Sequence, residues 1–276
     1  MATEIQEAAA GVARHDGWHA GDSYETYMGR WSRKIAPLFL DWIGVPSGCD
    51  WAEVGCGTGA LSAAVLTEGK PRSLVAIDPS QEFIATARSL LPDQRAEFRV
   101  GRAEALPVGD GSFDVIVSAL VLNFVPDRKK ALAEMRRVAR SRATVAFYVW
   151  DYPGGGMEMM RKFWSTAAVL DPSAAELSED RRFPFCTADG LTRLAREADL
   201  RGIAVRAIEV PTHFQNFEDF WLPFTLGAGP APGYCMALAP ESRQRLKETL
   251  RMRLTADAGG RICLSARAWA LKAVAP

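Results

Sequence analysis

An acidic residue followed by three glycines at alternate positions could do chemistry in this chain. They are Glu53, then Gly55, Gly57 and Gly59. A glycine-dense turn lets the backbone come close to a ligand, because no Cβ atom stands in the way. An apolar run further along the chain ends at Asp78, and a carboxylate in that place can accept hydrogen bonds from ribose hydroxyls. The spacing therefore indicates a site that holds a nucleoside.

Such a site needs a strand before the glycine turn and a helix after it. Apolar runs that read as strands alternate with stretches that read as helices, which predicts an α/β fold with a parallel, doubly wound sheet. Ser80, Asp127 and Thr187 stand where helix N-caps are expected, and Gly69 suits a C-terminal cap. The expected strands are residues 50–54, 74–77, 96–100, 113–118, 143–150, 205–210 and 261–273.

The glycine turn is compatible with two kinds of cofactor. Gly55, Gly57 and Ala60 satisfy the dinucleotide fingerprint, so an NAD-dependent oxidoreductase is one interpretation. The tighter glycine spacing and the acid at Glu53 favour S-adenosylmethionine instead, because dinucleotide sites usually carry an apolar residue there. Glu53 could face the amino group of a methionine moiety.

Two further segments follow the turn and Asp78 in order: Gly101-Arg102-Ala103-Glu104-Ala105-Leu106-Pro107 and Phe113-Asp114-Val115-Ile116-Val117-Ser118. Together these motifs resemble the class I S-adenosylmethionine-dependent methyltransferases, specifically methyltransferase type 11, similar to the ubiquinone/menaquinone C-methyltransferases. The resemblance covers roughly residues 35–150 well and the C-terminal part only by topology. It implies a Rossmann-like, seven-stranded, mostly parallel sheet with helices on both faces and a helical lid insertion.

The resemblance also implies roles for individual residues. The three glycines would pack under the methionine and ribose, Glu53 would lie near the sulfonium and amino end, and Asp78 would accept both ribose hydroxyls. Asp78 has an alternative interpretation as a cap of the helix at Ser80. The remaining expected cofactor contacts are Ala103 and Glu104 at the adenine, Ser118 on the methionine side, and Tyr27 and Arg33, with Tyr24 nearby, at the cofactor carboxylate.

Plainer interpretations stay open for part of this set. Glu104 could be an ordinary surface residue, and Tyr27 and Arg33 could belong to a surface helix with aromatic anchors. His15 and His19 have a spacing that could bind metal on a helix, but Gly17 lies between them and no third ligand follows. We therefore predict no metal site.

The motifs do not identify a catalytic residue. Relatives often carry a Leu-His-His-type segment after the fourth strand, and here it is Leu122-Asn123-Phe124, so a histidine-base mechanism does not transfer. His213 could serve as a base or be a partly buried polar residue. Asp151 and Tyr152 are the best polar candidates in an acceptor pocket.

The predicted domains are an N-terminal helical cap over the cofactor (1–34), a Rossmann-like core (35–210 and 261–276) and an inserted helical lid (211–260). The lid region is rich in aromatic residues and glycine. The segment 150–157 after the fifth strand shares this composition. Together they would enclose an apolar or aromatic acceptor, although an ordinary accessory core is also compatible with the composition.

Composition limits the possible partners. The 276 residues carry 33 Lys+Arg and 33 Asp+Glu, and this balance gives no general attraction to nucleic acid or an anionic membrane. No apolar run is long enough to span a bilayer, and the N-terminus lacks signal-peptide features. Five cysteines without metal spacing indicate free thiols in the cytoplasm.

We therefore predict a small-molecule methyltransferase of open oligomeric state. The alternatives are the NAD-dependent oxidoreductase and a non-catalytic module that binds S-adenosylmethionine. Oxygen, nitrogen and carbon all stay open as the methylated atom.

Overall fold

The computed structural model describes residues 25–227 and 229–276 of the chain. In this part of the chain, seven strands form one sheet in the order β3-β2-β1-β4-β5-β7-β6. Neighbours from β3 to β5 pair in parallel, and β7 runs antiparallel to β5. The strands are β1 (Asp50–Val54), β2 (Ser73–Asp78), β3 (Ala96–Val100), β4 (Phe113–Ala119), β5 (Ala139–Trp150), β6 (Arg201–Phe214) and β7 (Ile262–Val274).

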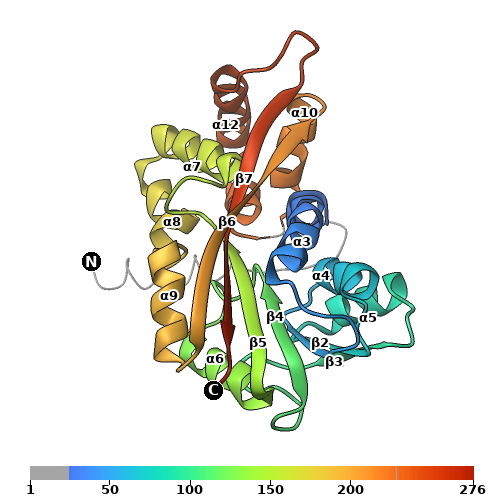
Figure 1. Ribbon diagram of the computed structural model, residues 1–276. Helices are drawn as coiled ribbons and strands as arrows, with labels where there is room; N and C mark the ends of the chain where they lie inside the picture. The colour runs from blue at the N-terminus through green and yellow to red at the C-terminus, as the bar shows by residue number, and fades with distance from the viewer. Residues whose placement is uncertain (1–24, 228) are drawn as a thin grey trace. The chain divides into compact units, whose positions relative to one another are not determined.

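Helices connect the parallel strands and cover both faces of the sheet, as the predicted Rossmann-like fold requires. Figure 1 shows α3, α4 and α5 on one side and α6 and α9 on the other. The order of strands and their mostly parallel pairing confirm the predicted fold class. These helices are α3 (Arg30–Ile43), α4 (Ala60–Ala64), which continues as η2 (Val65–Gly69), α5 (Gln81–Leu90), α6 (Arg128–Val138) and α9 (Ala188–Glu197).

The chain divides into two compact units. The core unit comprises residues 31–151, 185–209 and 267–276, and the accessory unit comprises the described residues up to Arg30 together with 152–184 and 210–266. Further helices lie wholly within the accessory unit: η1 (Glu25–Gly29), α7 (Glu158–Leu170), η3 (Pro172–Leu177), α8 (Glu179–Arg182), α10 (Phe217–Trp221), η4 (Leu222–Thr225), α11 (Pro230–Ala237) and α12 (Pro240–Arg253).

Aromatic side chains fill the core of the accessory unit. Phe163 stacks on Phe224 with ring centroids 4.3 Å apart, and Trp164 lies 5.3 Å from Tyr234. The ring of Tyr27 meets Phe224 edge-on at 6.2 Å. Burial of such large rings contributes strongly to the stability of a small unit.

Three predicted helix caps are confirmed. Ser80, Asp127 and Thr187 accept backbone N–H bonds at 3.3, 3.0 and 3.0 Å, respectively. The predicted cap at Gly69 is wrong, because the helix continues through η2 and Lys70 takes the left-handed conformation with φ of 43°. A π-helical turn contains more residues than an α-helical turn. The left-handed residue that ends the helix is therefore Lys70 and not Gly69.

Two strands are longer than predicted. Strand β5 begins at Ala139 rather than at 143, and β6 spans 14 residues where six were expected. In β6 the first residues are mostly exposed or half-buried and buried residues alternate with exposed ones only toward the end, so hydrophobicity does not mark where the strand begins.

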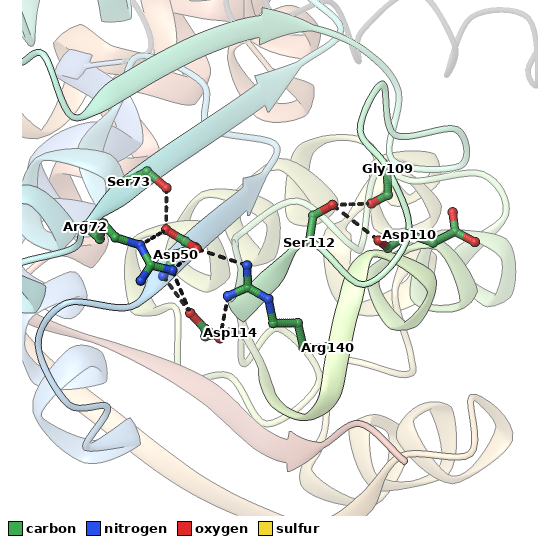
Figure 2. A network of polar contacts seen from close by, with 8 residues as sticks. All are labelled: Asp50, Arg72, Ser73, Gly109, Asp110, Ser112, Asp114 and Arg140. Carbon is green, nitrogen blue, oxygen red and sulfur yellow. Dashed lines mark hydrogen bonds and ion pairs between the residues drawn. The ribbon is translucent and has the colours of Figure 1, made fainter.

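A network of charged residues ties the amino ends of four neighbouring strands together (Figure 2). The Asp50 carboxylate accepts hydrogen bonds from Arg72 Nε at 2.8 Å, from Ser73 Oγ at 2.8 Å and from Arg140 Nη2 at 3.1 Å. Asp114 accepts a second bond from Arg140 at 2.7 Å. The Arg72 guanidinium is the main cause that holds the pKa of Asp50 far below its usual range.

Among the described helices, none combines the length and the hydrophobicity that crossing a bilayer would require.

Candidate functional site

The carboxyl ends of β1, β2 and β4 bring the predicted cofactor residues of the core unit together. Glu53 pairs in register with Ala76 on one side and Val117 on the other, so the three strands end side by side. The turn after β1 is held by the N–H of Gly55, which donates to the carbonyl of Ile77 at 2.7 Å. Ligands of open parallel sheets bind at this edge.

The glycine turn requires glycine for two separate reasons. Gly55, Gly57 and Gly59 all have positive φ, at 78°, 52° and 91°, which side chains with a Cβ rarely adopt. A Cβ on Gly55 would lie 2.3 Å from Val121 Cγ2, and one on Gly59 would lie 2.7 Å from Leu91 Cδ1. At Gly57, by contrast, no described atom outside Gly57 and its two chain neighbours lies within 4 Å of the Cβ position. The turn therefore packs against protein at its two ends and leaves space at its centre.

Asp78 connects the turn to the end of β2. Its carboxylate is buried and accepts hydrogen bonds from the N–H of Gly57 at 3.0 Å and from the N–H of Ser80 at 2.9 Å. The bond to Ser80 is the local one expected of an acid before a helix. The bond to Gly57 instead fixes the acid against the glycine turn. Burial raises the pKa of Asp78, and a carboxylate has further lone pairs for other donors.

Glu53 is a second buried carboxyl group, with 1% of its surface exposed. The hydroxyl of Ser62 in α4 donates to its Oε2 at 2.5 Å. Burial is the main cause that raises the pKa of Glu53 to about 8, and the charge of Asp78 adds to the rise. Sequence reasoning did not find Ser62, although a lone hydroxyl among apolar residues of the first helical turn was a usable signal.

The other predicted residues of the core unit lie in different environments. Ser118 is buried and its hydroxyl donates to the carbonyl of Val54 at 2.7 Å, which fixes β4 to the end of β1. Ala103 is buried in the turn after β3. Glu104 is half-buried and forms a long ion pair of 3.8 Å with Arg102. Arg33 lies exposed on α3.

Other candidate residues lie in the accessory unit. Tyr27 is buried, and its hydroxyl donates to Met160 Sδ at 3.0 Å. His213 lies near the end of β6 and is exposed, so the interpretation as a partly buried polar residue is wrong. In this strand alternate side chains face opposite ways, and His213 falls on the exposed set. Tyr24, His15 and His19 lie outside the described residues.

Asp151 directly follows β5 within the core unit and forms an ion pair. Only 1% of its surface is exposed, its Oδ2 accepts a hydrogen bond from Arg267 Nε at 2.7 Å, and the same oxygen forms an ion pair with Arg267 Nη2 at 2.5 Å. This pair gives Asp151 a structural role in joining β5 to β7. Tyr152, the next residue, is half-buried and belongs to the accessory unit.

Asn123 was noted only as a departure from the Leu-His-His pattern. Its side chain is 3% exposed, and its Nδ2 finds no hydrogen-bond partner among the described residues. Buried amides are nearly always hydrogen-bonded. The signal in the sequence was a polar residue within the apolar run 120–125.

Comparison with known proteins gives this arrangement a family. The family model described as a methyltransferase domain matches residues 52–147. A demethylmenaquinone methyltransferase of Renibacterium salmoninarum is 33% identical over 127 residues, which cover 46% of this chain and 50% of that relative. An uncharacterised 37.1 kDa protein of Streptomyces fradiae is 30% identical over 189 residues, covering 64% of this chain and 50% of that relative. The chain thus spans about half the length of these curated relatives.

Solved structures share the fold at low sequence identity. Phosphoethanolamine N-methyltransferase 2 of Haemonchus contortus, in complex with S-adenosylhomocysteine, is 15% identical with a TM-score of 0.58, covering 93% of this chain and 57% of that one. The [4+2]-cyclase SpnF is 18% identical with a TM-score of 0.53, covering 88% and 80%. At these identities the likeness concerns the fold alone. The family match and the fold together show that the chain carries a class I S-adenosylmethionine-dependent methyltransferase domain, which confirms the family, fold and cofactor predicted from its motifs.

Proposed function

We propose that the chain transfers the methyl group of S-adenosylmethionine to a small, apolar or aromatic organic acceptor and releases S-adenosylhomocysteine. In this displacement the acceptor nucleophile attacks the methyl carbon while the carbon–sulfur bond breaks and its electron pair returns to sulfur. The sulfonium already activates the methyl group, so alignment and the exclusion of water can supply most of the acceleration. A strong general base is not required when the acceptor is itself nucleophilic.

The observation that carries the proposal is the hydrogen bond between the Gly57 N–H and Asp78 beside the buried Glu53. It places two carboxyl groups around a glycine turn that has space at its centre. We assign Asp78 to the ribose hydroxyls and Glu53 to the amino group of the methionine moiety. The further proposed contacts are Gly55 and Gly59 beneath the cofactor, Ser118 on its methionine side, Ala103 and Glu104 at the adenine, and Tyr27 and Arg33 at the carboxylate.

The acceptor class rests on the composition of the accessory unit. Its buried surface is rich in aromatic rings, among them Phe163, Phe220 and Phe224. The name of the Renibacterium relative, a demethylmenaquinone methyltransferase, also supports a small-molecule acceptor. We propose that residues 1–34, of which 1–24 lie outside the described residues, act with residues 211–260 as covers of the cofactor and acceptor. Tyr152 is the preferred polar candidate at the acceptor, because His213 is exposed and Asp151 is held by Arg267.

The cysteines support a reducing compartment as the location of this activity. All five are free thiols in the structure, and three of them, Cys56, Cys186 and Cys235, are buried. We therefore propose the cytoplasm.

Titration calorimetry with S-adenosylmethionine, S-adenosylhomocysteine and NAD(H) tests the proposal. We expect the first two to bind and NAD(H) not to bind. Asp78→Ala should weaken S-adenosylhomocysteine binding by about 10- to 100-fold, because hydrogen bonds to a buried charge are worth about 1.5–3 kcal/mol. Asp93→Ala is a matched control, since Asp93 pairs with Arg95 on the surface.

Three results would contradict the proposal. Binding of NAD(H) alone would favour an oxidoreductase. Unchanged affinity in Asp78→Ala, with a wild-type circular dichroism spectrum, would remove Asp78 from the site. Binding of S-adenosylmethionine without formation of S-adenosylhomocysteine with any tested acceptor class would favour a non-catalytic binding module.

A further inference from the structure

The accessory unit contains a cavity that the cofactor residues do not explain. Its volume is about 310 Å³, at the lower end of the range of about 300–1,000 Å³ that is typical of small-molecule sites. Its wall comes from the loop after β5, from α7, and from η3 and α8 with the residue between them. Its lining residues include Tyr152, Met157, Met160, Trp164 and Glu179.

Glu179 supplies the buried charge of this wall. Glu179 is 3% exposed, and the indole Nε1 of Trp164 donates a hydrogen bond to its Oε2 at 2.5 Å. The other charged lining residues, Arg161, Asp180 and Arg181, are exposed, and Arg161 pairs with Glu158 at 2.8 Å. Burying a carboxylate is costly unless donors surround it, and a carboxylate can accept several donors at once. Glu179 can therefore hold Trp164 and a ligand donor together.

Part of the remaining wall is formed by aromatic rings and methionine sulfur atoms. Trp164, Met157 and Met160 are buried, and Tyr152 is half-buried with its ring 6.0 Å from that of Phe183. Aromatic faces attract cations electrostatically, and thioethers adapt to apolar ligands of different shapes. A buried carboxylate beside such a surface suits a ligand with a cationic head and a compact apolar body.

We infer that this cavity binds a small primary amine as its ammonium ion, with the Glu179 carboxylate accepting from the ammonium group and the aromatic and methionine side chains enclosing its apolar body.

Calorimetric titration with 2-phenylethylamine and with its neutral counterpart 2-phenylethanol tests the cavity. At neutral pH the amine is charged and the alcohol is not, while their apolar bodies are the same. We expect the amine to bind at least about tenfold more tightly, because a charge-assisted hydrogen bond to a buried carboxylate is the stronger kind. Glu179→Gln should remove this preference, whereas Glu176→Gln, an exposed glutamate of η3 outside the cavity, should leave it unchanged.

Different results would contradict the amine site and the proposed function. No binding of the amine up to about 10 mM, equal affinity for the alcohol, or an unchanged preference in Glu179→Gln would each overturn the amine site. If Glu179→Gln does not fold, Trp164→Phe keeps the aromatic surface and removes the N–H that orients the carboxylate, and the amine should then bind severalfold more weakly. S-adenosylhomocysteine titrated into the same samples tests the cofactor site, so its loss counts against the proposed function and not against the cavity.

Discussion

Two buried carboxyl groups, Glu53 and Asp78, lie at the ends of neighbouring strands, and burial determines their protonation. With a pKa of about 8, Glu53 is mostly protonated at neutral pH in the free protein. Its short bond with Ser62 lowers the pKa but does not offset the loss of water around the carboxyl group. A cationic amino group placed beside it would favour the charged form.

The raised pKa of Glu53 makes stability depend on pH. The folded-state value of about 8 exceeds the ordinary 4.5, so the stabilisation is full below pH 4.5 and is lost as pH rises through 8. We expect the free energy of unfolding to fall by on the order of 3 kcal/mol between pH 5 and pH 8, since one pKa unit corresponds to about 1.4 kcal/mol. Urea denaturation at several pH values measures this.

The matched variant for this measurement is Glu53→Gln, which keeps the shape of the side chain and cannot ionise. Its unfolding free energy should decline less over the same pH interval. Equal slopes for the two proteins would mean that Glu53 does not titrate there.

Gly55 offers a second test at the scale of single residues. Gly55→Ala places a methyl group 2.3 Å from Val121 Cγ2 at a backbone φ of 78°. We expect the free energy of unfolding to fall by about 2–5 kcal/mol, because overpacking costs about 1–3 kcal/mol and a left-handed backbone about 1–2 kcal/mol. The double variant Gly55→Ala/Val121→Ala should recover the packing part alone. A double variant no more stable than the single one would show that the backbone dominates.

At the scale of elements, the parallel strands are fixed at both ends by polar contacts of different kinds. Their carboxyl ends carry the glycine turn and the buried acids, whereas their amino ends carry the ion pairs of Asp50 with Arg72 and Arg140 (Figure 2). The strands therefore cannot slip in register without breaking one set or the other, which keeps the cofactor residues aligned.

Asp50→Asn tests the network at the amino ends. Because Arg72 holds the pKa of Asp50 below its usual range, its stabilisation is present above about pH 4 and is lost as pH falls below that value. At neutral pH we expect the variant to lose about 1–2 kcal/mol, since charged hydrogen bonds partly open to water are worth about that much. Chemical denaturation at pH 7 and pH 3 should show a difference that shrinks in acid.

Asp93→Asn is the control for this element, because Asp93 pairs with Arg95 at the surface within one short loop. It should change stability less than Asp50→Asn. An equal loss of unfolding free energy in both variants would mean that the strand-end network stabilises the protein no more than a surface ion pair does.

At the scale of the whole molecule, the core unit follows from local sequence signals. Turn glycines, apolar runs and capping residues such as Ser80 and Thr187 act over a few residues, and parallel βα units repeat them in order. The sequence therefore predicted the sheet, its main helices and the residues at the carboxyl ends of β1, β2 and β4.

The remainder depends on contacts between distant parts of the chain. Tyr27 bonds to Met160 across 133 positions, and Asp151 bonds to Arg267 across 116. A single sequence contains no signal for such pairs. For this reason we did not predict the pairing of Asp151 with Arg267 or the burial of Glu179. Nor did we predict that residues 152–184 belong to the accessory unit.

The order in which a ribosome makes this chain has a consequence for its folding. Strand β5 pairs with β7 from Thr144 opposite Val274 to Trp150 opposite Ala268, so one edge of β5 stays open until residues 268–274 have been synthesised. The accessory unit likewise needs residues up to Ala266. An open strand edge can pair with other chains. In the nascent protein this edge of β5 has no β7 to pair with until more than a hundred further residues have been synthesised.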